Sequence, residues 1–145
     1  MKKMEDIQNE LQQKYMEMQY MEQHMNQYNQ QLESIDSQLE EIDKLTEGLD
    51  TLDNKESGSE LLVPVSNGIF AKAKLSEDRK LIMNVGAKVA VEKDTESAKE
   101  LLRKQKSEIQ KARIQITGII ESIAEQMQDS EKEIRELMKK VNKDV

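Results

Sequence analysis

Residue types that perform catalysis are scarce in this sequence. It contains no cysteine, which excludes thiolate nucleophiles, disulfides and cysteine-ligated metal sites. His24 is the only histidine, and it lies one position before an apolar residue, so we expect a solvated side chain. The carboxylates are spread along helix faces, and no G-x-x-x-x-G-K-[ST] phosphate-binding loop occurs. We therefore expect no catalytic residue, no metal site, no cofactor and no enzymatic activity.

Noncovalent binding by apolar side chains is the chemistry that remains, and their spacing predicts a long helix. Between about residues 2 and 53, apolar residues recur three and four positions apart over seven heptads. Twelve of the fourteen seam positions are apolar, which predicts one strand of a left-handed coiled coil. The fourteen are Met4, Ile7, Leu11, Lys14, Met18, Met21, Met25, Tyr28, Leu32, Ile35, Leu39, Ile42, Thr46 and Leu49.

A second helical pattern begins near residue 95, where Asp94 or Thr95 offers an N-cap. One step of four, from Ile123 to Met127, is a stutter that locally unwinds a supercoil. The predicted seam of this helix is Ala98, Leu102, Gln105, Ile109, Ala112, Ile116, Ile119, Ile123, Met127, Ser130, Ile134, Leu137 and Val141.

The distribution of charge favours an antiparallel pairing of the two helices within one chain. Residues 1–56 carry 14 acidic and 5 basic residues, whereas residues 95–145 carry 10 acidic and 11 basic residues. When the chain folds back on itself, the acidic end of the first helix lies beside the basic start of the second. The acidic residues are Asp36, Glu40, Glu41, Asp43, Glu47 and Asp50, and the basic residues are Lys99, Arg103, Lys104, Lys106, Lys111 and Arg113.

The segment between the helices changes to the period of β-strands. Four short apolar runs, 61–65, 69–75, 81–85 and 88–92, are separated by turn residues and indicate two consecutive β-hairpins. Pro64 cannot donate a ladder hydrogen bond, which predicts an edge in the first run. We expect a single domain with an N-terminal helix over 1–53, an oligomerisation body over 54–94 and a C-terminal helix over 95–145.

Two small hairpins leave strand edges and an apolar face without partners, which favours assembly with other subunits. The alternative is that the base of the coiled coil covers them, although a two-helix coil has little apolar surface to spare. We expect assembly contacts at Leu62, Val63, Val65, Ile69, Leu75, Leu81, Val85 and Val89.

The overall composition restricts the class of partner. Aromatic residues make up 3% of the chain and charged residues 35%, which suits long helices packed along a seam. A net charge of −7 argues against a nucleic-acid partner. No apolar run approaches the ~20 residues needed to cross a bilayer, and the first residues lack a signal-peptide pattern. We expect a cytoplasmic protein with no nucleic-acid and no membrane partner.

The hairpin segment contains two motifs, the LVPV-x-x-G run from Leu62 to Gly68 and the VG-x-x-VAVEK run from Val85 to Lys93. These two motifs resemble those of the prefoldin family. The resemblance covers nearly the whole chain, and two hairpins rather than one are typical of that family's alpha-type subunits. It implies a mainly α fold, a long antiparallel two-helix coiled coil with two central β-hairpins that contribute to an intersubunit β-barrel. It also implies a hetero-hexamer of two alpha-type and four beta-type subunits.

The same resemblance implies the function of an ATP-independent molecular chaperone. Such a protein captures unfolded, non-native client proteins at the tips of its coiled coils and transfers them to a group II chaperonin. A structural coiled-coil scaffold, or a filament-forming prefoldin-like protein, is the alternative function. Residues 1 and 145 are then expected to meet at the tip, although the seam residues there can instead pack against each other; Met138 and Met16 lie off the seam. The expected client contacts are Met4, Ile7, Leu11, Ile134, Leu137, Met138 and Val141.

Overall fold

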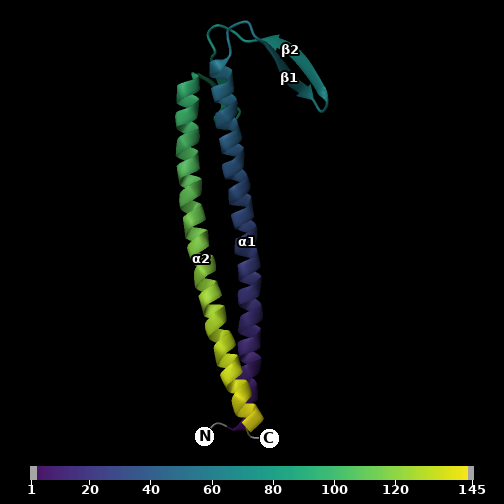
Figure 1. Cartoon of the computed structure of the whole chain (residues 1–145), viewed down its shortest axis with the longest axis vertical. Helices are drawn as coiled ribbons and strands as arrows, with labels where there is room; N and C mark the ends of the chain where they lie inside the picture. Colours follow the sequence, from purple (N-terminus) through teal and green to yellow (C-terminus); the bar gives the residue numbers. More distant parts are fainter. Residues whose placement is uncertain (1–2, 144–145) are drawn as a thin grey trace. The chain divides into compact units, whose positions relative to one another are not determined.

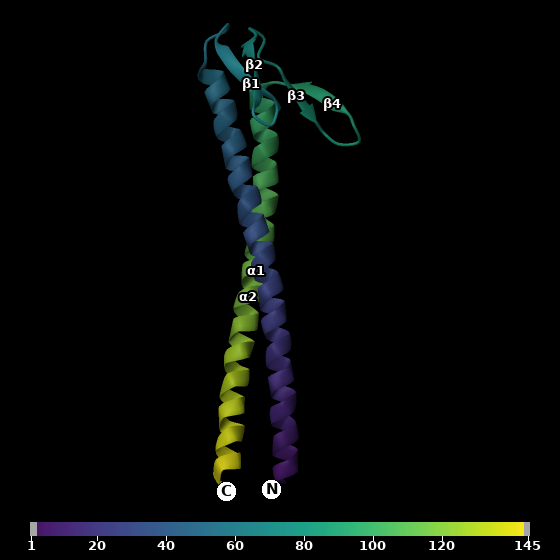
Figure 2. The same ribbon diagram turned by 90° about the vertical axis from the view of Figure 1, so that its right-hand side faces the viewer.

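A computed structural model describes residues 3–143 and confirms two long helices separated by two small antiparallel hairpins. The elements, labelled between them in Figures 1 and 2, are α1 (Met4–Asn54), β1 (Glu60–Ser66), β2 (Ile69–Lys74), β3 (Leu81–Asn84), β4 (Ala90–Lys93) and α2 (Thr95–Lys143). The chain divides into two units. We call residues 1–37 with 110–145 the helical unit, and residues 38–109 the hairpin unit. Within each unit, α1 and α2 lie side by side (Figures 1 and 2).

Helix α1 follows the predicted seam closely. Its 51 residues contain no proline and a single glycine, Gly48, so nothing interrupts the backbone ladder. All fourteen predicted seam positions are buried or half-buried. Ile7 is buried in the helical unit and Ile42 in the hairpin unit, so the apolar seam of α1 contains a buried residue in each unit.

Helix α2 begins at Thr95 because Asp94 caps it. The Oδ1 atom of Asp94 accepts a hydrogen bond from the backbone N–H of Ser97 at 2.8 Å, which satisfies one of the donors that every helix start leaves open. Hydrogen bonds from Ser97 lower the pKa of Asp94, so the carboxylate stays charged at the positive end of the helix.

The seam of α2 departs from prediction at two positions. Gln105 and Ile119 are exposed, whereas Lys106 and Ile120 are half-buried. A straight helix has 3.6 residues per turn, so two turns take slightly more than seven residues. The line of contact with α1 therefore shifts, relative to a strict seven-residue repeat, to the residue that follows the predicted position. The remaining predicted positions are buried or half-buried, with Ala98 and Leu102 among the most buried.

Three ion pairs between the helices confirm the predicted antiparallel register. Three acidic residues spaced seven apart in α1 face three basic residues spaced seven apart in α2, and their order is reversed. A parallel pairing would have set like ends together and broken these contacts. The pairs are Asp36–Arg113 at 2.7 Å in the helical unit, and Asp43–Lys106 at 2.7 Å and Asp50–Lys99 at 2.5 Å in the hairpin unit.

Strands β1 and β2 form a hairpin whose register places Val63 opposite Ala71 and Pro64 opposite Phe70. The register shifts between Pro64 and Ser66, where the proline nitrogen has no hydrogen to donate. Gly68 in the turn has a φ of +78°, a conformation in which a side chain would be strained.

Strands β3 and β4 form the second hairpin, with Met83 opposite Val91. Leu81 and Met83 are half-buried in an apolar hollow of about 420 Å³ that α1 and α2 also line. The alternative in which helices cover the hairpins therefore holds in part for β3. It does not hold for Ile82, which is 74% exposed.

Candidate functional site: exposed apolar surfaces

The hairpin of β1 and β2 carries large apolar side chains that stay exposed in the described chain. The register puts Val63 and Ala71 on one face and Leu62, Pro64 and Phe70 on the other. A sheet of two strands covers too little apolar surface to be stable alone, so packing of both faces against other elements would stabilise it. The side chains that are large, apolar and exposed here are Leu62, Val63, Val65, Ile69 and Phe70.

The eight residues expected at the assembly surface divide by exposure. Leu75 and Leu81 are half-buried, so they already contact the chain's own side chains. The other six are exposed and free to contact another subunit: Leu62, Val63, Val65, Ile69, Val85 and Val89.

Sequence reasoning missed Phe70 and Ile82 as members of this surface. Strand alternation placed Phe70 on the face of Lys72 and Lys74, which reads as a solvent face. No sequence signal identifies Phe70, the only phenylalanine of the chain, because its place opposite Pro64 and its exposure appear only in the folded hairpin.

The residues expected at the tip fall into buried and exposed groups. Ile7, Ile134 and Leu137 are buried, and Met4, Leu11 and Val141 are half-buried. Met138 is exposed, and its sulfur accepts a hydrogen bond from the Tyr15 hydroxyl at 3.7 Å. The predicted meeting of residues 1 and 145 lies outside the described residues.

Exposed Met and Tyr side chains extend this surface along α1. Met16 is 65% exposed and Tyr20 is 64% exposed, and the two lie four positions apart on one flank of the helix. Sequence reasoning named Met16 and missed Tyr15 and Tyr20. All three tyrosines of the chain fall between residues 15 and 28, and that clustering was the available signal.

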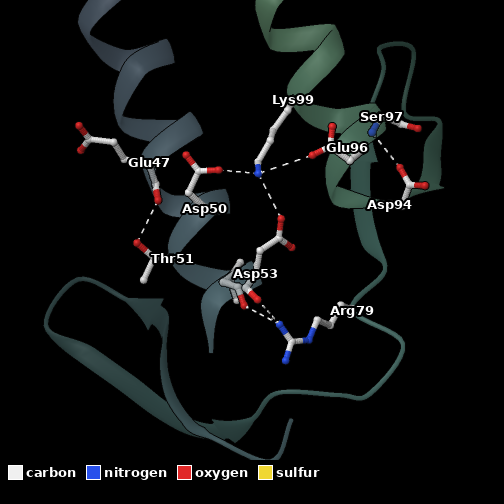
Figure 3. A network of polar contacts seen from close by, with 10 residues as sticks. Glu47, Asp50, Thr51, Asp53, Arg79, Asp94, Glu96, Ser97 and Lys99 are labelled. Carbon is white, nitrogen blue, oxygen red and sulfur yellow. Dashed lines mark hydrogen bonds and ion pairs between the residues drawn. The ribbon is translucent and has the colours of Figure 1, made fainter. Parts of the chain in front are cut away.

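A polar junction in the hairpin unit fixes where the hairpins leave the helices (Figure 3). Helix α1 has no basic residue in its last turn, so its C-terminal carbonyl groups lack a local cation. Arg79, from the β2–β3 connection, supplies it. Its guanidinium donates to the main-chain oxygens of Leu52 at 3.1 Å and Asp53 at 2.6 Å, and to that of Lys55.

Lys99 joins the start of α2 to the same junction. It is largely buried, and its ammonium group lies 2.5 Å from Asp50 and 3.1 Å from Asp53, as Figure 3 shows. Hydrogen bonds to Asp50 and then Asp53 raise the pKa of Lys99. A hydrogen bond from the Thr95 side chain, followed by one from Lys99, lowers the pKa of Asp53. Both pKa shifts therefore favour the charged forms of Lys99 and Asp53.

The chain offers few side chains for covalent chemistry, with one histidine and no cysteine. His24 is half-buried rather than solvated, because its ring contacts that of Tyr20 at a centroid distance of 4.5 Å. Within residues 3–143, no group of three or more possible ligands is placed to hold a metal ion. Neither helix in that range has an apolar stretch of the length that crossing a bilayer requires.

The fold and its exposed surfaces define a class: an antiparallel two-helix coiled coil whose central hairpins expose apolar side chains. Residues 21–140 match the family model described as Prefoldin subunit. The chain therefore belongs to the prefoldin family. Two hairpins agree with the alpha type, which is also the type of the relatives that the chain matches.

Curated relatives named Prefoldin subunit alpha come from archaea. The chain is 45% identical to that of Methanothrix thermoacetophila over 58 residues, which are 40% of this chain and 38% of the relative. It is 34% identical to that of Nitrosopumilus maritimus over 85 residues, 59% of each chain. The chain thus matches between about two fifths and three fifths of these relatives' own length.

A solved structure has the same fold. The filamentous PFD from Methanocaldococcus jannaschii superimposes with a TM-score of 0.69 at 16% sequence identity. The superposition covers 77% of this chain and 93% of that chain. At this identity the likeness establishes the arrangement of helices and hairpins.

Proposed function

We propose that this chain is the alpha-type subunit of an ATP-independent chaperone that captures non-native proteins. The observation that carries the proposal is the uncovered apolar surface of the β1–β2 hairpin in a member of the prefoldin family. A protein that only needed a stable coiled coil would gain nothing from exposing Val65 and Ile69.

The hairpins join other subunits in this proposal. Each strand of a two-stranded sheet has one unpaired edge, and edges together with apolar faces favour a closed intersubunit β-barrel. The assembly is a hetero-hexamer in which two alpha-type subunits combine with four beta-type subunits, as the family resemblance implies.

Clients bind at the free ends of the helices, and the complex passes them to a group II chaperonin. Weak contacts from several arms add through effective concentration, so no single surface needs high affinity. Met138 can contact a client directly because it is exposed, whereas Ile134 and Leu137 become available only when the seam opens.

The test combines size and activity. The purified chain is mixed with a beta-type prefoldin subunit, and its mass is measured by light scattering, followed by aggregation of a denatured protein without ATP. We expect a hexamer that suppresses aggregation. Removing residues 1–11 and 134–145 should lower the suppression and leave the hexamer intact. Equal protection by the truncated complex would contradict the client assignment.

A structural filament subunit is the second candidate, since the solved structure of the same fold is titled a filamentous PFD. The same size measurement separates the two functions. A defined hexamer that forms only on mixing supports the chaperone, and long assemblies of the chain alone support the filament.

A further inference from the structure

A groove on the helical unit offers client-binding groups without opening the seam. It has a volume of about 650 Å³ and lies between residues 13–21 of α1 and 126–133 of α2. Its apolar side chains come from Met16, Tyr20 and Met21. A second hollow, of about 410 Å³, shares the lining residues Gln13, Lys14, Glu17 and Glu133 with it. We call the two hollows together the flank groove.

The charged residues of the flank groove are mainly acidic. Across both hollows, five carboxylates stand against two ammonium groups. One of the two, Lys14, forms ion pairs with Glu133 and, at 3.9 Å, with Glu17. Its hydrogen bond to Glu133 raises the pKa of Lys14. Each of these ion pairs also engages a carboxylate, and the excess of five carboxylates over two ammonium groups leaves the net charge of the flank groove negative. The five acids are Glu10, Glu17, Asp129, Glu133 and Glu136.

Met21 belongs to the seam, but the two other apolar residues of the groove do not serve the coiled coil. Met16 and Tyr20 lie off the seam and are about two thirds exposed, so they add little to the pairing of α1 with α2. Methionine adapts to irregular partners, and tyrosine combines an apolar ring with a polar tip. Such residues beside carboxylates fit a partner that alternates apolar and cationic side chains.

We infer that the flank groove binds basic amphipathic segments of non-native polypeptides, in which Lys or Arg alternates with apolar residues. This inference rests on the proposed chaperone function and names the class of client sequence that the helical unit selects. Apolar client side chains contact Met16 and Tyr20, and client cations pair with Glu17 and Asp129.

The inference is tested with two labelled peptides that share their apolar positions and carry Lys in one and Glu in the other. Binding to the full chain, assembled with its beta-type partner, is followed by fluorescence anisotropy. Exposed ion pairs are individually weak, so the two pairs at Glu17 and Asp129 predict about three- to tenfold tighter binding of the lysine peptide. The preference should shrink toward parity as salt approaches ~1 M.

Two double variants separate the charged from the apolar contribution. Glu17→Gln with Asp129→Asn should abolish the preference for the lysine peptide and leave binding of the glutamate peptide at least as strong. Met16→Gln with Tyr20→Gln should weaken the binding of both peptides. The matched controls are Glu33→Gln with Glu121→Gln, and Ile114→Gln, which change exposed residues of the same unit outside the groove.

Equal affinity for both peptides, or a preference that survives the carboxylate variant, would overturn the inference. The inference would also be overturned if Met16→Gln with Tyr20→Gln abolished self-association and left peptide binding unchanged. That result would mean that a second copy of this chain occupies the groove. Suppression of aggregation, measured on the same complexes, distinguishes failure of this inference from failure of the proposed function. A complex that protects clients without charge preference refutes only the inference, and one that protects none refutes the proposed function.

Discussion

Replacing Arg79 with asparagine tests whether a distant guanidinium holds the end of α1. Arg79 has a φ of 48°, a left-handed conformation that asparagine tolerates, so the turn survives while the cation is lost. A cation at a helix C-terminus contributes ~0.3–1 kcal/mol, and a hydrogen bond from a charged donor contributes ~1.5–3 kcal/mol when buried. Because Arg79 is half-buried, we expect a total of about 1–2 kcal/mol for the local opening of this junction.

That free energy corresponds to a factor of about 5–30 in the opening equilibrium. Hydrogen exchange followed by mass spectrometry measures it directly, because exchange of amides near residues 50–56 reports local opening. Arg79→Asn should raise their exchange rate by that factor and leave amides near Ile7 unchanged. Arg79→Lys should give an intermediate rise, since one ammonium cannot reach three carbonyl oxygens.

Lys80→Gln is the matched control, because the side chain of the neighbouring Lys80 pairs with Glu92, at 4.0 Å, and is 58% exposed. It should leave exchange at residues 50–56 as it was. Equal rates in Arg79→Asn and the parent chain would refute the capping role. An equal rise in Lys80→Gln would show that the connection merely needs positive charge.

Three further outcomes follow from the structure. Folding lowers the pKa of Asp53, so its contribution to stability is present above the ordinary pKa of ~3.9 and is lost as pH falls through the lower folded pKa. Hydrogen exchange measured along an acid titration should therefore show the junction opening only below about pH 4. Asp53→Asn should remove that pH dependence. Leu102→Ala should lower stability by about 2–4 kcal/mol in thermal unfolding, whereas Ile114→Ala, at an exposed position, should stay within ~0.5 kcal/mol, and similar losses in both would contradict the assigned seam. Ile69→Asp with Val85→Asp should block assembly with a beta-type subunit while leaving the helical circular dichroism intact, and an unchanged hexamer by light scattering would refute the assembly surface.

The helices and hairpins were predictable because their patterns repeat. A seam that recurs every three and four residues identifies a helix by many independent positions, so single exceptions such as Lys14 and Thr46 do not disturb it. The antiparallel register was predictable from charge, because acids and bases cluster at ends that meet only when the chain folds back. The exceptions at Gln105 and Ile119 arise from helical drift, which a strict heptad ignores.

The junction around Arg79 could not be predicted from the sequence. Its guanidinium bonds to main-chain oxygens 24–27 residues away, and no periodic pattern records such a contact. The same holds for Phe70, since alternation assigns a residue to a face but does not say whether that face is covered. Both depend on tertiary placement, which the local pattern leaves open.

In the proposed chaperone, burial decides which residues can bind a client without damage to the coiled coil. Ile134 and Leu137 are buried, and exposing a side chain of this kind costs roughly 1.5–3 kcal/mol, so a client that used both would have to offset several kcal/mol before gaining affinity. Met16, Tyr20 and Met138 carry no such cost, because they are already exposed. Weak, rapidly exchanging contacts of a holdase are therefore expected first at the off-seam residues. The seam residues would contribute to clients that bind tightly enough to separate the two helices.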